Sequence, residues 1–298
     1  MNLGYDIGTA FSDTFRFVRD KWVWMVVWGA ALIILPTLPV IPLFGWLIAN
    51  AAELGNDPDA INEAMGLNLL SNLASVIQIA LGVFIYGAVV RYIVGIQRTG
   101  QFAGLRAGMD ELWVLVCMII YYIGMLVALM AIIAVASIIG LIVSLASGVT
   151  GVGVGIGILV GLAGIVPVVW AGVRLSLLIP ASVEKNTLAF SQAWNASKGR
   201  FWPLLGTWVI IMLISIVLTV ILTTIIGVVG LGVMGTGAAM GLEMDAASLT
   251  SWVPLIVVGV LLLLVPVFAY TGIYYSLMVA PFASAWRQIN PNVVEHFS

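Results

Sequence analysis

Long stretches without a charged side chain constrain this fold more than any other feature. They cover 22–52, 64–90, 112–173, 201–242 and 246–286. A helix needs about 20 apolar residues to cross a hydrocarbon layer about 30 Å thick, so every stretch is long enough. The chain is 62% hydrophobic and only 8% charged, whereas soluble domains have about 25% charged residues. The sequence therefore predicts an all-α membrane protein.

The run 112–173 is too long for one crossing, and Gly148 to Gly157 are expected to mark its reversal. Six transmembrane helices result. We expect the first and third to exceed the hydrocarbon thickness and to tilt or emerge in part. The predicted spans are 22–50, 66–90, 112–147, 155–179, 202–229 and 250–280.

The basic residues give the predicted orientation. With these spans, all eleven fall on one side of the membrane: Arg16, Arg19, Lys21, Arg91, Arg98, Arg106, Arg174, Lys185, Lys198, Arg200 and Arg287. The opposite loops contain only acidic charges: Glu53, Asp57, Asp59, Glu63, Glu243 and Asp245. The positive-inside rule then predicts that both termini are cytoplasmic.

A segment with apolar residues at helical spacing precedes the first, third and fifth spans. In the first segment, the stripe comprises Ile7, Phe11, Phe15, Val18 and Trp22, which predicts a cytoplasmic amphipathic interfacial helix. The middle segment has a similar stripe at Phe102, Leu105, Met109 and Leu112. The expected organisation is a single membrane domain, 1–298, divided into the interfacial segment 1–21, hairpin 22–90, interfacial segment 91–111, hairpin 112–179, interfacial segment 180–200, hairpin 201–283 and tail 284–298.

Two internal matches suggest that the three hairpins form a parallel repeat. Ala10-Phe-Ser12 corresponds to Ala189-Phe-Ser191 at an offset of 179, and Trp170–Arg174 corresponds to Tyr270–Tyr274 at an offset of 100. Aromatic and basic residues also recur at membrane boundaries for interfacial reasons alone, which is the competing explanation.

Residues that usually carry catalysis are scarce. The only histidine is His296 and the only cysteine is Cys117, so neither an acid–base pair involving histidine nor a cysteine metal site is expected. Gly230, Gly232 and Gly235 have the spacing of a dinucleotide fingerprint, but they lack its strand–helix context and are interpreted as a flexible outer loop. The sequence predicts a protein that is not an enzyme and has no cofactor and no metal.

Three further features allow a structural and a functional interpretation. Gly157 and Gly161 favour close helix packing. Pro36, Pro39 and Pro42 predict a break in the first span, which could be a hinge, an entry for a lipid tail or a simple kink followed by an outer amphipathic or re-entrant piece. Neutral polar residues could line a path for a small solute, although hydrogen bonding between helices is favoured: Asn68, Asn72, Gln78, Thr219, Thr223 and Thr224.

Basic and aromatic residues near the predicted cytoplasmic surface have the chemistry to bind lipid phosphates, although the positive-inside rule also explains them. The candidate lipid-headgroup or interfacial residues are Arg19, Lys21, Arg174, Trp194, Lys198, Arg200 and Trp202.

Part of the chain resembles the membrane domain of the glycerophosphoryl diester phosphodiesterase family. The resemblance rests on Arg174-Leu-Ser-Leu-Leu-Ile-Pro180-Ala, Leu188-Ala-Phe-Ser-Gln-Ala-Trp194 and Lys198-Gly-Arg-Phe-Trp202. It implies a stand-alone multi-pass protein of the bacterial cytoplasmic (inner) membrane with a connection to lipids. It transfers no catalytic residue, because no segment of the chain is large enough for the soluble phosphodiesterase domain.

The favoured function is therefore a non-enzymatic membrane protein that organises or binds lipids or partner proteins. The expected partners are membrane lipids, a membrane protein or a second copy of the chain, and not nucleic acid. The alternative is a transporter or channel for a small neutral or amphiphilic solute. A membrane-embedded lipid enzyme is the least favoured class.

Overall fold

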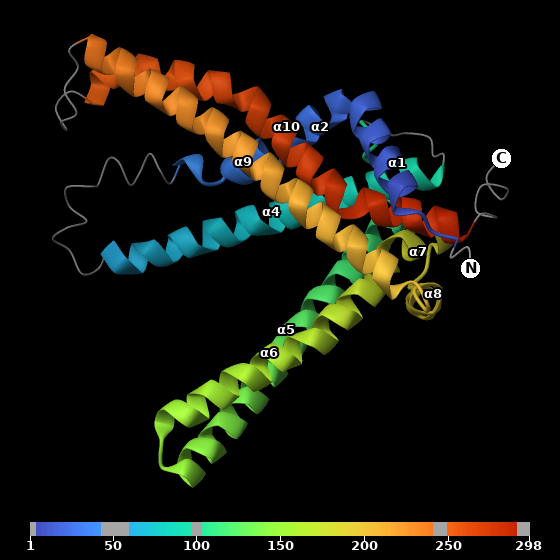
Figure 1. The fold of residues 1–298 in the computed structure, drawn as a ribbon. Coiled ribbons are helices and arrows are strands. Elements are labelled where there is room, and N and C mark those ends of the chain that lie inside the picture. Colours follow the sequence, from blue (N-terminus) through green and yellow to red (C-terminus); the bar gives the residue numbers. More distant parts are fainter. Residues whose placement is uncertain (1–3, 43–59, 97–102, 241–248, 291–298) are drawn as a thin grey trace.

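The computed structural model describes residues 4–42, 60–96, 103–240 and 249–290, and its regular elements there are helices (Figure 1). They are α1 (Ile7–Asp20), α2 (Trp22–Thr37), α4 (Ala60–Val94), α5 (Met109–Ser147), α6 (Thr150–Leu175), α7 (Leu178–Lys185), α8 (Phe190–Ala196), α9 (Phe201–Ala239) and α10 (Leu249–Ile289).

The predicted all-α membrane protein is confirmed. Five described segments are helical, long and apolar enough to cross a membrane, and they lie in α4, α5, α6 with α7, α9 and α10. In the most apolar window of α5, none of the residues is buried inside the protein. Helices with outward-facing apolar side chains and internally bonded backbones are what a bilayer requires.

The first predicted span, 22–50, differs from the observed helix. Helix α2 has 16 residues and ends at Thr37, inside the proline segment. Proline provides no backbone N–H, so Pro36 and Pro39 weaken the hydrogen-bond ladder at this point. The predicted break is therefore present, while residues 43–59 lie outside the described part of the chain.

Two glycine-rich segments that were predicted to be loops are helical. The reversal between α5 and α6 needs only Gly148, at φ 66°, and Val149, while Gly151 to Gly157 belong to α6. Gly230, Gly232 and Gly235 belong to α9, which continues to Ala239. The apolar residues between these glycines explain the difference, because in lipid a helix satisfies the backbone hydrogen bonds within its own segment.

Helix α1 begins where the sequence predicts a helix. The Asp6 carboxylate accepts hydrogen bonds from the backbone N–H groups of Gly8 and Thr9, at 3.3 and 2.8 Å, and from the Thr9 hydroxyl at 2.6 Å. These hydrogen bonds lower the pKa of the Asp6 carboxyl, and the bond from the Thr9 hydroxyl has the largest effect. The buried face of α1 includes Phe11 and Phe17, whereas Phe15, from the predicted stripe, is exposed.

The other two interfacial segments differ from the prediction. Residues 103–108 are not helical, and the rest of the described middle segment belongs to the ends of α4 and α5 or to the turn after α4, so it forms no separate interfacial helix. Ala103 and Gly104 have φ of 48° and 77°, which no right-handed helix accommodates. The third segment forms two short helices, α7 and α8, because Asn186 ends α7 with φ 51°.

Helix α10 is the centre of the packing. It contacts α1, α2, α4, α7 and α9. Its closest approach is to α2, where a Cβ on Gly29 would lie 1.8 Å from the Phe268 carbonyl oxygen and a Cβ on Gly272 would lie 2.0 Å from the Met25 carbonyl oxygen. Only glycine permits this backbone contact between the two helices.

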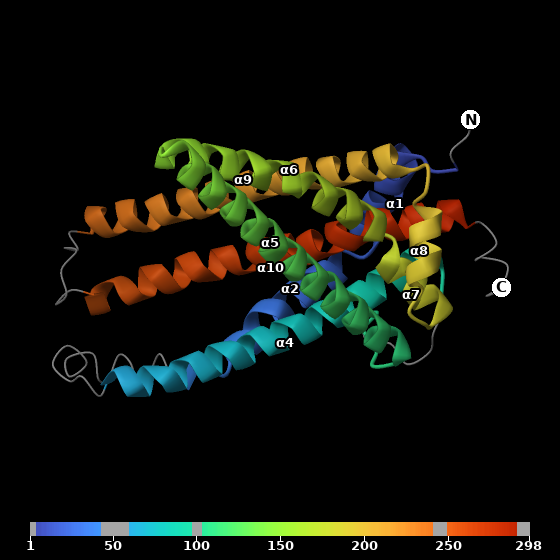
Figure 2. The same ribbon diagram turned by 90° about the horizontal axis from the view of Figure 1, so that it is seen from below.

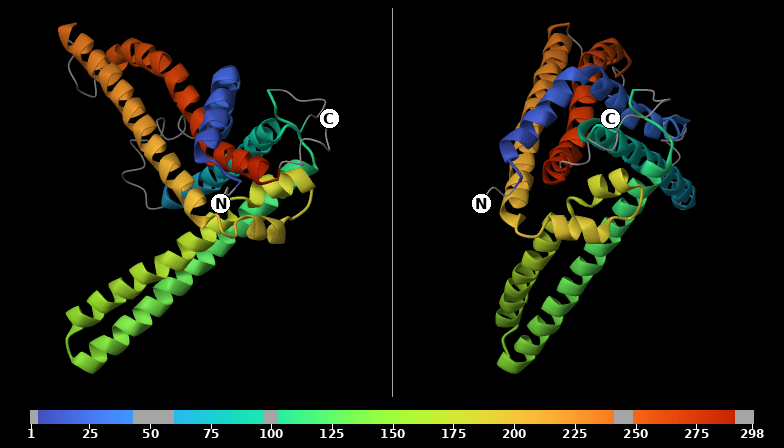
Figure 3. Two further views of the ribbon diagram at one scale, coloured as in Figure 1. Left: turned by 45° about the vertical axis from the view of Figure 1, so that its right-hand side comes forward. Right: turned by 90° about the vertical axis from the view of Figure 1, so that its right-hand side faces the viewer.

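Helices α5 and α6 form a long antiparallel hairpin that projects away from α9 and α10 (Figures 1 and 3). Seen from below, the turn between α5 and α6, the start of α4, the end of α9 and the start of α10 lie on the same side, opposite α7 and α8 (Figure 2). Helix α5 has 39 residues, which corresponds to about 58 Å. A hydrocarbon layer of about 30 Å therefore requires strong tilt or an emerging end, as predicted for this helix.

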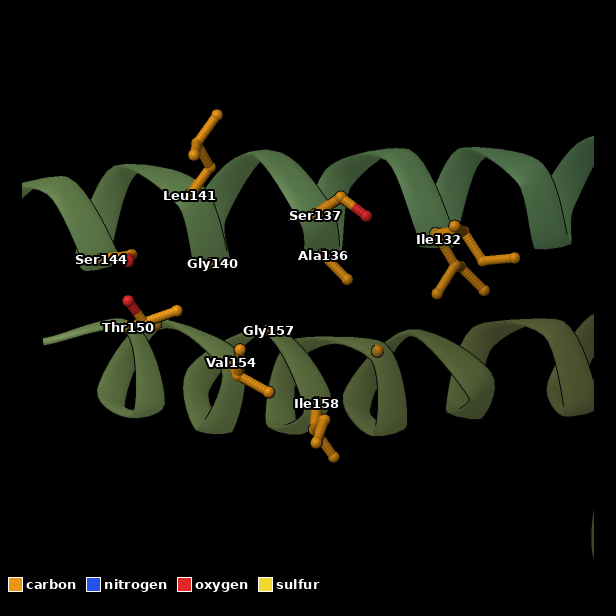
Figure 4. A pocket seen from close by; sticks show the side chains of 13 residues that line it. Ile132, Ala136, Ser137, Gly140, Leu141, Ser144, Thr150, Val154, Gly157 and Ile158 are labelled. Atoms are coloured by element: carbon orange, nitrogen blue, oxygen red, sulfur yellow. The ribbon is translucent and has the colours of Figure 1, made fainter.

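Small residues allow the α5–α6 hairpin to pack closely (Figure 4). A Cβ on Gly153 would lie 2.3 Å from the Gly140 carbonyl oxygen, and one on Gly157 would lie 3.1 Å from that of Ala136. Gly161 faces the same Ala136 at 3.8 Å. The packing interpretation of Gly157 and Gly161 is therefore confirmed, and Gly153 is the closer contact.

The corresponding glycines of the proposed repeat have different partners. Gly172 of α6 faces Tyr121 of α5, in its own hairpin, whereas Gly272 of α10 faces Met25 of α2, in the first predicted hairpin. The matched sequences thus occupy different packing environments, and α10 joins the first and third hairpins into one unit.

Candidate functional site

The short helices α1, α7 and α8 lie at one end of the bundle (Figures 1 and 3), and charged side chains of the described residues gather there. Each described ion pair joins residues of this end: Arg19–Asp20, Arg91–Asp110, Arg91–Glu111, Lys185–Glu184 and Arg287–Asp13. We refer to it as the charged end. It contains every candidate residue named from the sequence.

Arg174 occupies an aromatic cage between α6 and α8. Its guanidinium carbon lies 4.6 Å from the ring centre of Trp170 and 4.9 Å from that of Trp194. Phe190 stacks on the Trp194 ring; the two ring centres are 6.1 Å apart and the ring planes are nearly parallel. No carboxylate lies within ion-pair distance of Arg174 among the described residues, and its buried Nε has no hydrogen-bond partner. The cation is thus held by the faces of two rings.

The turn after α8 and the first residues of α9 contain three further candidates. Lys198 is exposed, and Trp202 is 76% exposed at the start of α9. Arg200 donates a hydrogen bond from Nη1 to the Ala196 carbonyl at 2.8 Å, so it closes the end of α8. We call Arg174, Trp194, Lys198 and Trp202 the aromatic–basic corner.

Arg19 and Lys21 lie elsewhere at the charged end. The Lys21 ammonium is 4.7 Å from the ring centre of Trp24, and Arg19 pairs with the neighbouring Asp20 at 3.2 Å. Tyr5, two residues before α1, forms a 2.5 Å hydrogen bond with Thr207 of α9, so the start of α1 lies near α9. The length of α1, about 21 Å for 14 residues, therefore separates these two cations from the aromatic–basic corner.

A buried ion cluster joins the end of α4 to the start of α5. Arg91, only 2% exposed, donates from Nη1 to Glu111 and from Nη2 to the Gly104 carbonyl at 3.1 Å. Asp110 lies 3.6 Å from the same guanidinium. A Cβ on Gly87 would lie 3.2 Å from Glu111 and 3.3 Å from Arg91, so this glycine leaves space for the pair.

Sequence reasoning missed this cluster. The predicted spans ended at residue 90 and began again at 112, so they excluded Arg91 and Glu111 by one residue each, although both are buried in the structure. Opposite charges at facing ends of consecutive spans were the signal that could have identified the pair.

A second polar group ties α1, α4 and α10 together. Arg287 donates to Asp13 of α1 at 2.6 Å and to the Ile93 carbonyl of α4 at 2.8 Å, and Ser284 donates to the same Asp13 at 2.5 Å. The indole of Trp286 donates to Glu184 of α7. These contacts use cations and carboxylates to fix the helices rather than to create an open site.

The neutral polar residues have different roles. Thr219 of α9 hydrogen-bonds to Tyr270 of α10 at 3.0 Å, as the interpretation of bonding between helices requires. Thr223 and Thr224 bond only to carbonyls of their own helix. Gln78 lies close to the hydroxyl of Tyr275 of α10. Asn72 is exposed, and the side chain of Asn68 lies outside the described part of the chain.

Within the described segments, no three histidine, cysteine or carboxylate side chains are grouped closely enough to bind a metal ion. Cys117 is buried, with its sulfur 3.3 Å from the Ser182 hydroxyl. His296 lies outside the described residues. The fold and this charged end define a helical membrane protein. The chain matches no family among those compared, no curated protein and no solved structure.

Proposed function

We propose that the chain crosses the bacterial cytoplasmic membrane six times, as three hairpins, and has both termini in the cytoplasm. Five long apolar helices, together with the short α2 leading into 43–59, support six crossings. The gathering of the described basic residues at one end supports the orientation. The resemblance of positions 170–205 to the phosphodiesterase membrane domain supports a relationship to that family and a location in the bacterial cytoplasmic membrane.

Cysteine labelling tests this topology. Single cysteines at positions 57 and 245 should react with an impermeant maleimide added outside spheroplasts, whereas cysteines at 98 and 185 should react only after the membrane is opened. The native Cys117 is buried, and a Cys117→Ala background removes its signal. Outside labelling at position 98 or 185 would contradict the orientation.

We further propose that the protein is not an enzyme and binds the phosphate groups of anionic membrane lipids at the aromatic–basic corner. The observation that carries this proposal is Arg174, a cation held between two indole rings with no carboxylate in range among the described residues. A lipid phosphate would provide the missing anion. The exposed Lys198 adds a second positive charge, and the exposed Trp202 suits the headgroup region.

Native mass spectrometry with phosphatidylglycerol tests the lipid proposal. A basic group near an anionic surface contributes about 1 kcal/mol, so the double variant Arg174→Gln/Lys198→Ala should retain this lipid roughly 30-fold less well. Lys185→Ala is the matched control, because Lys185 pairs with Glu184 at 2.9 Å. Equal retention by the double variant and the control would refute the site.

A further inference from the structure

An apolar groove of about 540 Å³ runs between α4 and α5, and one of its walls is a carboxylate. Apart from Glu111 and Gly108, its lining is apolar: Val76, Ile79, Ala80, Val83, Phe84, Ala107, Leu112, Leu115 and Ile119. This volume lies within the range of small-molecule sites, about 300 to 1,000 Å³. The groove is distinct from the aromatic–basic corner, which is built from α6, α8 and α9.

Glu111 has one satisfied and one unsatisfied oxygen. Oε1 accepts from Arg91, while Oε2 is buried and has no hydrogen-bond partner. The whole residue is only 4% exposed. A buried carboxylate oxygen in apolar surroundings is unfavourable unless a donor reaches it, so this atom indicates a missing N–H or O–H group.

Gly108 places no side chain against this carboxylate oxygen. A Cβ at this position would be in tight contact with Glu111 Oε2, at 3.3 Å, and would lie 3.8 Å from Arg106 Nε. Gly108, which lines the groove, therefore lies close to both a carboxylate and a guanidinium. One negative and one positive group beside the same glycine match a zwitterionic ligand, whose ammonium and phosphate have the opposite signs.

The order of polar and apolar groups gives the ligand its direction. Glu111 and Gly108 lie at the charged end, at the start of α5. The apolar lining then extends away from that end to Ile119, about 12 Å further along the helix. A phospholipid of the adjacent leaflet has the same order, with its headgroup at the surface and its chain directed inward.

We propose that this groove binds phosphatidylethanolamine, with its primary ammonium on Glu111 Oε2, its phosphate toward Arg106 and one acyl chain between α4 and α5. The ammonium is the part of the headgroup that can donate hydrogen bonds. Phosphatidylcholine has the same charges and the same chains but no N–H, so it cannot satisfy the Glu111 oxygen.

Native mass spectrometry with these two lipids tests the proposal. The full chain should retain phosphatidylethanolamine about tenfold better than phosphatidylcholine of the same chain length, as expected for a hydrogen bond to a charged group. Glu111→Gln should abolish that preference, because its amide keeps an oxygen for Arg91 but removes the charge. Its retention of phosphatidylglycerol should stay unchanged, which separates this groove from the aromatic–basic corner.

A second variant tests the groove without altering the ion cluster. Ala80→Trp should fill the groove and lower phosphatidylethanolamine retention about tenfold, whereas Ala131→Trp, on the exposed face of α5 outside the groove, should leave it unchanged. Helical circular dichroism checks that each variant is folded. Equal retention of the two lipids by the native chain, or equal phosphatidylethanolamine retention by both tryptophan variants, would overturn the proposal. A changed oligomeric mass of Ala80→Trp without lost lipid would also overturn it, since the groove would then join two copies.

Discussion

Arg91→Met is expected to lower the free energy of unfolding by about 3–5 kcal/mol, because it leaves the buried Glu111 without its cation and removes the neighbour of Asp110. Unfolding by titration with a denaturing detergent in micelles measures this loss. Arg19→Met is the control. The side chain of Arg19 is 78% exposed and pairs with the adjacent Asp20, so its replacement should change stability by less than about 1 kcal/mol.

A double variant separates the pair from the packing around it. Arg91→Met/Glu111→Leu removes the stranded carboxylate together with its cation, so it should be more stable than Arg91→Met alone. The pair would then be needed because each charge is buried, and not because the pair adds much stability by itself. A double variant as unstable as the single one would show that the guanidinium acts mainly through packing and through its bond to Gly104.

Gly29→Ala is expected to lower the free energy of unfolding by about 3 kcal/mol, at the upper end of the range for overpacking. The added methyl group would lie 1.8 Å from the Phe268 carbonyl oxygen, a backbone atom that no rotamer change can move away. Helices α2 and α10 must separate to accommodate it. The same detergent titration measures the loss, and Gly272→Ala should have a similar effect, since its methyl would lie 2.0 Å from the Met25 carbonyl oxygen.

The control for these variants is Gly227→Ala in α9, where a Cβ meets no atom within 4 Å. Alanine has the higher helix propensity, so this change should be neutral or stabilising by up to about 1 kcal/mol. Because the first separation makes room for the second methyl, Gly29→Ala/Gly272→Ala should lose less than the sum of the single variants. A loss in Gly29→Ala no larger than that in Gly227→Ala would mean that the two backbones are not in contact.

Both sets of variants remove contacts that hold neighbouring helices together. The contacts of Gly29 with Phe268 and of Gly272 with Met25 bring the first and third hairpins together within the apolar bundle. The Arg91–Glu111 pair links the end of α4 to the start of α5 at the charged end. Loss of either contact should disturb the charged end. The lipid tests therefore rely on Arg174, Lys198 and Ala80, which do not take part in these contacts, and on the milder Glu111→Gln, whose amide keeps an oxygen for Arg91.

Much of the helix pattern could be predicted from the sequence because the bilayer imposes it. Uncharged runs gave the extent of α5 to within a few residues, and one-sided basic residues agreed with the charged end seen in the structure. Errors arose where a local rule competed with the apolar environment. The glycines of α6 and α9 were predicted to form loops. The turn at Ala103 and Gly104 was predicted to belong to an amphipathic helix.

The individual residues of the candidate site could be predicted from the sequence, but their arrangement in space could not. The sequence identified Arg174, Trp194, Lys198 and Trp202 by their chemistry, but it also included Arg19 and Lys21, which the length of α1 separates from them. Trp170 and Arg174 are neighbours four residues apart on α6, which the spacing along the chain accounts for. The second wall of the cage, Trp194, comes from α8, and no spacing along the chain encodes that approach.

What the sequence by itself determined is the solvent in which this chain folds and the end at which its charges gather, because hydrophobic length and charge position are local properties tested against the bilayer. The tertiary structure decided which helices touch. Between apolar helices in lipid, pairing depends on where small residues let backbones approach and where buried charges find partners. Gly29 against α10 and Arg91 against Glu111 are such places, and each partner is identified only by the fold.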